Sequence, residues 1–191
     1  MNEKKDNILT IAQKIFSRFG IQKTTMDEIA KKARIGKATL YYYFKNKEDI
    51  FREVIQKEAT ILKENIEKEL KKVRTPQEKI SAYILTRMKT LKELSNYYEA
   101  LITNDYFEHY KFIDEERKEF TNYEINLFES ILIDGMCENV FTVENTKETA
   151  RMIIIAMKGL EFPLIIENSS DSIEKDIEPL VNILLKGIET R

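Results

Sequence analysis

Apolar residues recur every three or four positions along almost the whole chain, and strict alternation of polar and apolar residues is nearly absent. This spacing is typical of amphipathic helices, which bury one face and expose the other. The 191 residues include only five Gly and three Pro, so long irregular loops are not expected. The pattern predicts an all-α fold of about nine helices in one or two compact domains.

The first two helices have clear start and stop signals. An apolar stripe predicts a first helix over residues 4–19, which Gly20 can end because glycine readily adopts a positive φ. Thr25 and Glu28 have the capping-box spacing that opens a short second helix. A tight turn is then expected between this second helix and the third.

The third predicted helix spans residues 37–44, with Leu40 and Phe44 facing inward because they are four residues apart. Asn46 then has the position of a cap for a long fourth helix, which ends before Pro76. Two short helices and a long one are therefore expected to follow the first helix.

Further start and stop residues predict a fifth helix from Thr75-Pro76, a sixth over about 95–106, a seventh over about 111–134 ending before Gly135, an eighth opened by Asn145 and interrupted at Pro163, and a ninth through Ile188. The centre of the eighth helix, residues 152–166, is apolar on nearly every side, and the ninth helix carries an apolar stripe. These two helices offer more apolar surface than a monomer would expose, which favours a homodimer.

Charge is unevenly distributed along the chain. The net charge is only −2, but residues 1–50 hold 11 Lys/Arg against 6 Asp/Glu, a balance of +5. The remaining 141 residues hold 20 basic and 27 acidic side chains, a balance of −7. A basic N-terminal region on an acidic remainder is the asymmetry expected when one end of a protein faces phosphates.

Cysteine content and targeting signals say little about the function of the protein. The lone Cys137 cannot form an internal disulfide and is expected to be a buried small residue. No apolar run approaches the roughly 20 residues that cross a bilayer, so a cytoplasmic protein is expected. His109 is the single histidine, and no cluster has metal-ligand spacing, so no metal or other cofactor is predicted.

Residues 4–52 resemble the N-terminal pattern of the TetR family of transcriptional repressors. The matching positions are Phe16, Gly20, Thr24, Thr25, Ile29, Ala30, Ala33, Thr39, Leu40, Tyr41, Tyr43, Phe44, Lys47 and Glu48. The resemblance implies a three-helix, helix-turn-helix DNA-binding domain at residues 1–48. It also implies a helical effector-binding and dimerisation domain at residues 49–191.

The resemblance further implies DNA contacts from the second and third helices and their flanks: Thr25, Arg34, Gly36, Lys37, Ala38, Thr39, Tyr41, Tyr43 and Lys47. Lys37 can donate to guanine O6 and N7, and Ala38 can touch a thymine methyl. Thr25 and Lys47 are expected on phosphates. Tyr42 is expected to turn away from DNA, because three consecutive residues spread around a helix.

Two positions depart from the family pattern. Arg34 stands in the turn where the family usually has Gly, and an Arg at positive φ costs on the order of 1 kcal/mol more. Gly36 replaces the usual Ser or Thr cap of the third helix, so a side-chain acceptor is lost. Neither change removes the DNA-binding interpretation.

Residues 49–191 are rich in Met, Tyr and Phe, which favours an apolar or aromatic effector over a nucleotide or a sugar. For each side chain the alternative is ordinary core packing. The candidate effector-binding residues are Met88, Leu91, Tyr98, Ile102, Phe107, Tyr123, Phe128 and Met152.

An enzyme is not predicted, because the chain shows no paired nucleophile and base and no Gly-rich phosphate loop. The sequence favours a homodimeric regulator, a repressor that an effector releases from a palindromic double-stranded DNA operator. The alternative is a helix-turn-helix protein without a small-molecule effector that is controlled by protein contact. A cavity of about 300 Å³ or more among the fifth to seventh helices would favour the sensor.

Overall fold

The computed structural model describes residues 3–94, 114–161, 163 and 173–190. Within these ranges the regular elements are α-helices, and one isolated bridge pairs Phe141 with Glu189. The all-α prediction is therefore confirmed. The predicted sixth helix falls outside the described residues. No helix in the described ranges is both long and apolar enough to cross a membrane.

The chain divides into two compact units. The head unit comprises Met1–Thr60 and Leu94–Arg117, and the body unit comprises Ile61–Glu93 and Lys118–Arg191. The division falls within one long helix, whereas the sequence placed a domain boundary at residue 48. That boundary stays a prediction about which segments fold independently.

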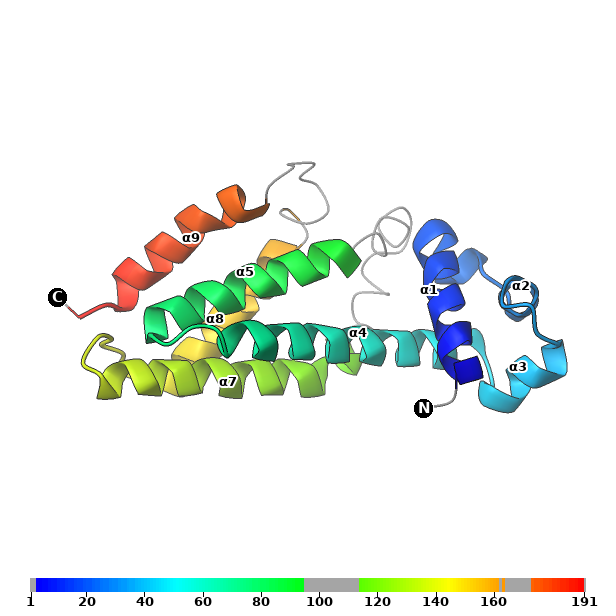
Figure 1. Ribbon diagram of the computed structural model, residues 1–191, viewed down its shortest axis with the longest axis horizontal. Helices are drawn as coiled ribbons and strands as arrows, with labels where there is room; N and C mark the ends of the chain where they lie inside the picture. Colours follow the sequence, from blue (N-terminus) through cyan, green and yellow to red (C-terminus); the bar gives the residue numbers. More distant parts are fainter. Residues whose placement is uncertain (1–2, 95–113, 162, 164–172, 191) are drawn as a thin grey trace. The chain divides into compact units, whose positions relative to one another are not determined.

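The head unit contains α1 (Glu3–Lys23), α2 (Met26–Lys32), α3 (Lys37–Tyr43) and the first part of α4 (Lys47–Leu70) (Figure 1). These helices bury one apolar cluster, which includes Ile8, Phe16, Ile29, Leu40, Phe44, Ile50 and Phe51. The inward positions of Leu40 and Phe44 are confirmed, since they are 0% and 2% exposed.

The predicted caps of the head unit are present. The Glu28 amide donates to Thr25 Oγ1 at 3.2 Å, and the Thr25 amide donates to Glu28 Oε2 at 2.8 Å. The Asp49 amide donates to Asn46 Oδ1 at 2.7 Å. Gly20 has φ 76°, as its type predicts, but one further turn follows it and carries α1 to Lys23.

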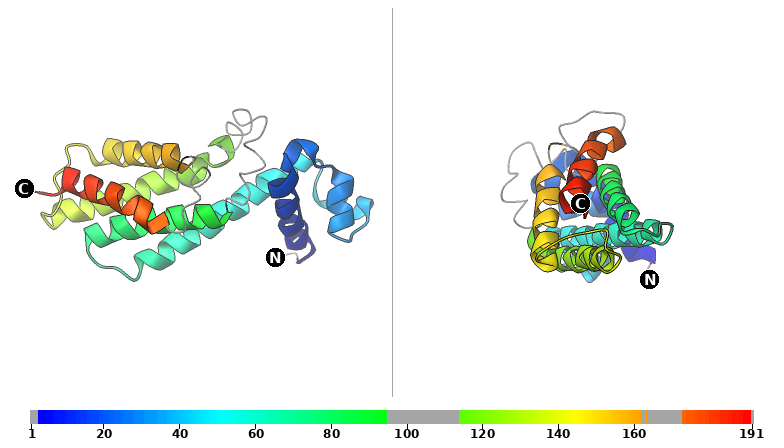
Figure 2. Two further views of the ribbon diagram at one scale, coloured as in Figure 1. Left: turned by 90° about the horizontal axis from the view of Figure 1, so that it is seen from above. Right: turned by 90° about the vertical axis from the view of Figure 1, so that its left-hand side faces the viewer.

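The body unit contains the rest of α4 with α5 (Pro76–Leu94), α7 (Lys118–Cys137), α8 (Thr146–Glu161) and α9 (Ile173–Ile188) (Figure 2). Each helix contributes to a second apolar cluster, which includes Ile66, Ile80, Tyr83, Met88, Phe128, Leu132, Ile154, Met157 and Ile177. The amphipathic stripes predicted for α5 and α9 therefore meet in one core with the C-terminal part of the α4 stripe, whose N-terminal part belongs to the head cluster.

Two of the three expectations for the later helices have clear outcomes. The predicted stop at Gly135 is wrong, because α7 continues to Cys137. A Cβ at Gly135 would lie 2.0 Å from the Phe141 ring, so glycine serves close packing there. Cys137 is exposed rather than buried. The interruption expected at Pro163 stays a prediction, because α8 is described as far as Glu161 and residues 162 and 164–172 lie outside the described ranges.

Candidate functional site

The turn between α2 and α3 has the backbone geometry of a tight helix-to-helix connection. Arg34 has φ 56°, so it adopts the left-handed conformation considered for this turn position from the sequence. The Ile35 amide donates to the Ala30 carbonyl at 3.0 Å and closes the end of α2. This turn sets the angle at which α3 leaves α2.

The helix α3 has one buried side and one exposed side. Gly36 is its N-cap and makes no side-chain cap hydrogen bond, as its type requires. Lys37, Ala38 and Tyr41 are exposed, while Thr39 and Tyr43 are half-buried. Tyr42 is 83% exposed, so its side chain is not part of the core. Whether Tyr42 faces DNA stays a prediction.

The ammonium of Lys37 is held by a carboxylate of the preceding helix. Lys37 Nζ lies 2.7 Å from Asp27 Oδ1, and both side chains are more than half exposed. The hydrogen bond to Asp27, followed by its charge, raises the pKa of Lys37 above the ordinary lysine value. The lysine is therefore a cation whose head group is positioned by α2.

Thr25 and Lys47 are engaged within the head unit itself. The Thr25 hydroxyl and amide both donate to Glu28 Oε2, at 3.0 and 2.8 Å. Lys47 Nζ donates to the carbonyl oxygens of Gln22 and Thr24, at 3.2 and 3.3 Å. Lys47 thus stabilises the loop that leads into α2, and its contact with a phosphate stays a prediction.

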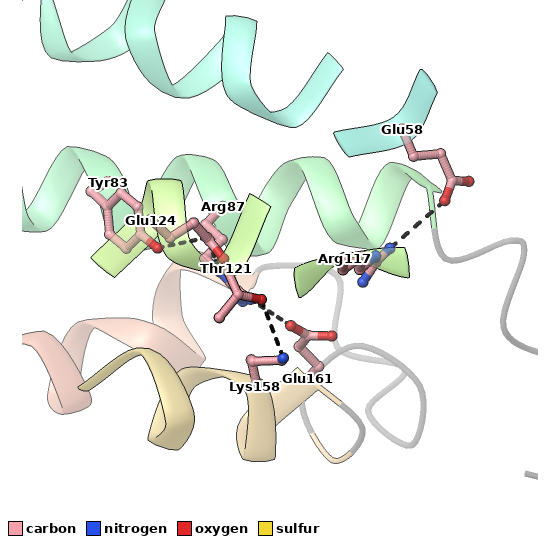
Figure 3. Close-up of polar contacts among 8 residues, drawn as sticks. All are labelled: Glu58, Tyr83, Arg87, Arg117, Thr121, Glu124, Lys158 and Glu161. Carbon is pink, nitrogen blue, oxygen red and sulfur yellow. Dashed lines mark hydrogen bonds and ion pairs between the residues drawn. The ribbon is translucent and has the colours of Figure 1, made fainter. Parts of the chain in front are cut away.

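The body unit contains a buried polar cluster that the sequence did not single out. It consists of Tyr83 and Arg87 on α5, Glu124 on α7 and Glu161 on α8, which converge between three helices (Figure 3). Tyr83 Oη donates to Glu124 Oε1 at 2.6 Å, and Arg87 Nε donates to the same oxygen at 2.8 Å. Arg87 Nη2 donates to Glu161 Oε1.

Burial and charge keep Tyr83 and Arg87 protonated. Burial raises the pKa of Tyr83 well above its ordinary value, and the Glu124 carboxylate raises it further. Burial alone would lower the pKa of Arg87, but the carboxylates of Glu124 and Glu161 raise it. Tyr83 is therefore a neutral donor and Arg87 a cation. The one sequence signal was a charged residue, Arg87, within the apolar stripe of α5.

The predicted effector-binding residues lie in different environments. Met88, Leu91 and Phe128 are buried in the body core. Tyr123 is half-buried, and its hydroxyl donates to Glu67 Oε1 at 3.0 Å. Met152 is 51% exposed on α8, so it does not line the interior of the body unit. The remaining candidates, Tyr98, Ile102 and Phe107, lie outside the described residues.

A surface cleft of about 460 Å³ lies between α4 and α5 of the body unit. Its lining combines both signs of charge with a few apolar side chains: Asn65, Lys68, Glu69, Val73, Ala82, Leu85, Thr86, Lys89, Thr90 and Glu93. This cleft is not the cavity among the fifth to seventh helices that would favour a sensor. Within the described ranges, no group of three His, Cys, Asp or Glu residues could hold a metal ion.

Comparison with known proteins identifies relatives over the whole chain. The N-terminal domain model of the bacterial regulatory proteins of the tetR family matches residues 8–54. The HTH-type transcriptional regulator QacR of Staphylococcus aureus is 30% identical over 161 residues, which cover 82% of this chain and 83% of QacR.

Two solved structures share the fold. A transcriptional regulator from Cytophaga hutchinsonii has a TM-score of 0.73 and 26% identity, over 97% of this chain and 98% of its own. The fatty acid degradation regulator FadR from Bacillus halodurans has a TM-score of 0.79 and 21% identity, over 97% and 96%. These relatives are regulators of transcription rather than enzymes. The chain therefore belongs to the TetR family and is a DNA-binding, helix-turn-helix transcriptional regulator.

Proposed function

We propose that the protein is a homodimeric repressor that leaves a palindromic operator when a small molecule binds in the body unit. The observation that carries the proposal is the exposed side of α3, where Lys37, Ala38 and Tyr41 stand opposite the buried Leu40 and Phe44. A helix fixed by its apolar side and exposed on the other is what major-groove reading requires.

Each exposed residue has a distinct proposed role. Lys37 donates to guanine at the leading end of α3, and Ala38 contacts a thymine methyl. Arg34, Thr39, Tyr41 and Tyr43 contact phosphates or the edges of bases, and Gly36 allows close approach of the backbone. The +5 balance of residues 1–50 supports association with phosphates.

The proposed dimer is supported by apolar side chains that the body unit leaves exposed. Met152 and Ile155 on α8 are 51% and 46% exposed, and Ile183 on α9 is 69% exposed. Exposed apolar side chains on two neighbouring elements of the sequence are typical of subunit interfaces. A two-fold dimer would present its recognition helices about 34 Å apart, one turn of DNA.

Release by an effector follows from the continuity of α4. This helix runs from Lys47 to Leu70, with residues through Thr60 in the head unit and residues from Ile61 in the body unit. An effector that favours one packing of the body unit would shift α4 and thereby the spacing of the two heads. Operator affinity that is unchanged by every bound effector would contradict this mechanism.

A paired substitution tests the DNA-reading role of α3. The operator is first selected from random-sequence DNA with the wild-type protein. Lys37→Ala should weaken binding to this operator by about 1–3 kcal/mol and relax the preference at one base position. Lys45→Ala removes the same charge from an exposed residue beyond α3, and it should weaken binding to all DNA sequences by the same factor. An equal loss on all sequences for Lys37→Ala would make it a phosphate contact.

One observation favours the alternative function, that of a helix-turn-helix protein that has no small-molecule effector and is controlled by protein contact. Met88 and Phe128, two of the predicted effector-binding residues, are 0% exposed within a packed core. A filled core is what a protein controlled by protein contact would have. Isothermal titration calorimetry of small molecules with the purified full chain separates the two functions, because a protein controlled by protein contact would bind none of them.

A further inference from the structure

The guanidinium of Arg87 has donor groups that the surrounding protein does not use. Its side chain is buried, with 2% of the residue exposed. Nε and Nη2 donate to Glu124 and Glu161, but Nη1 has no hydrogen-bond partner in the described part of the chain (Figure 3). A buried donor without an acceptor destabilises the folded state. The position of Nη1 is therefore suited to an incoming acceptor.

The charges around Arg87 restrict what this acceptor can be. Two carboxylates, Glu124 and Glu161, already pair with the one guanidinium. A third carboxylate at Nη1 would lie close to both of them in a medium of low dielectric, where repulsion is strong. A cation has no lone pair to offer. A hydrocarbon would leave the N–H groups unsatisfied.

We propose that Arg87 Nη1 donates a hydrogen bond to a neutral oxygen of the effector. The effector is then a largely apolar molecule that carries a carbonyl or hydroxyl group, rather than a purely apolar, anionic or cationic one. This inference rests on the proposed function, in which the body unit binds a small molecule. It refines the apolar or aromatic effector expected from composition.

The rest of the effector would contact the apolar core of the body unit. Met88 and Met157 belong to the same buried cluster, and unbranched methionine side chains repack around a guest more readily than branched ones. The oxygen would be held where α5, α7 and α8 converge on Arg87. Its binding would favour one arrangement of these three helices, which is the differential contact that release requires.

The test uses the full chain and two series of small molecules with fixed skeletons. The decyl series is decane, 2-decanone, 1-decanol, decanoate and decyltrimethylammonium, and the naphthyl series carries the same five kinds of group. Affinity is measured by isothermal titration calorimetry. In at least one series the ketone or the alcohol should bind about tenfold tighter than the other members. Preference for the carboxylate, the ammonium or the hydrocarbon overturns the proposal, and so does the absence of binding.

Substitutions in the cluster assign the preference to Arg87. Glu161→Gln removes one competing charge, so it should improve carboxylate binding relative to ketone binding about fivefold or more. Glu148→Gln removes an exposed charge from the same helix and should change neither. Arg87→Lys keeps the cation but lacks Nη1, and it should lose the preference for neutral oxygen. If that variant does not fold, the Glu161→Gln result decides.

A DNA-release assay on the selected operator separates this inference from the proposed function. Ketones or alcohols that bind without releasing DNA would leave the assigned chemistry standing and contradict the repressor mechanism. Carboxylates that bind best and release DNA would leave the mechanism standing and overturn the role of Arg87 Nη1.

Discussion

Glu58 is a buried carboxylate on α4 of the head unit, with 2% of the residue exposed. Arg117 Nη2 lies 3.7 Å from Glu58 Oε2, whereas Glu58 Oε1 has no partner in the described ranges (Figure 3). Burial raises the pKa of Glu58 to about 7, against the opposing charge of Arg117 and a hydrogen bond with Gln13. The folded head therefore binds a proton that the unfolded chain releases at lower pH.

The raised pKa of Glu58 predicts a loss of stability as pH increases. Its protonation favours the folded state below the unfolded pKa of 4.5, and this advantage is lost as pH rises through about 7. Glu58→Gln should flatten this dependence and raise the free energy of unfolding at pH 8 by up to roughly 3 kcal/mol. Urea unfolding between pH 5 and 8 measures the effect. Glu64→Gln, an exposed control on α4, should behave like wild type.

Asp27 is predicted to restrain Lys37 before DNA is bound, because their head groups are 2.7 Å apart. Asp27→Asn should strengthen binding to random-sequence duplexes and reduce the ratio of specific to non-specific affinity. The released charge should also steepen the salt dependence by about one counterion. Fluorescence anisotropy at several salt concentrations is the measurement. An unchanged ratio would show that the ion pair does not influence recognition.

Residue types predicted part of the candidate site, because Lys37 and Ala38 begin a helix with a clear buried side. They did not reveal the partner of Lys37, since Asp27 is ten residues away and only the turn brings the two together. They also missed Glu124 and Glu161, which look like ordinary acidic residues of amphipathic helices. Their pairing with Arg87 depends on how three helices pack.

At the scale of elements, the turn between α2 and α3 stores strain at Arg34, whose φ is 56°. Arg34→Gly should raise the free energy of unfolding by about 0.5–1 kcal/mol, because relief of the left-handed strain exceeds the added entropy of the unfolded chain. Arg34→Ala keeps the strain and should give no gain. Thermal unfolding of both variants checks this, and equal stability of the two would refute it.

Local chemistry predicted several helix boundaries correctly, since a cap depends on side chains three residues apart. The boxes at Thr25-Glu28 and Thr75-Glu78 are both formed. Gly135 misled the same reasoning, because glycine is a stop signal and also a site of close packing. Position 135 has to be glycine because the Phe141 ring packs against it, and the local sequence does not reveal that contact.

At the scale of the whole molecule, the exposed apolar side chains Met152 and Ile155 on α8 and Ile183 on α9 predict a dimer. Ile183→Glu should convert the protein to monomers and weaken binding to the palindrome, because a charge would be buried in the interface. Asn126→Glu adds the same charge at an exposed position of α7 and should leave the dimer intact. Sedimentation velocity measures the mass, and a dimeric Ile183→Glu protein would place the interface elsewhere.

The sequence by itself determined the all-α class, the capped helix-turn-helix and the basic N-terminal region, because periodicity, caps and charge are local properties. The tertiary structure decided which side chains meet. It placed Met152 on the surface, tied Lys47 to the carbonyls before α2, and gathered Tyr83, Arg87, Glu124 and Glu161 in one core. Contacts between distant helices follow from packing, which residue spacing along one helix does not specify.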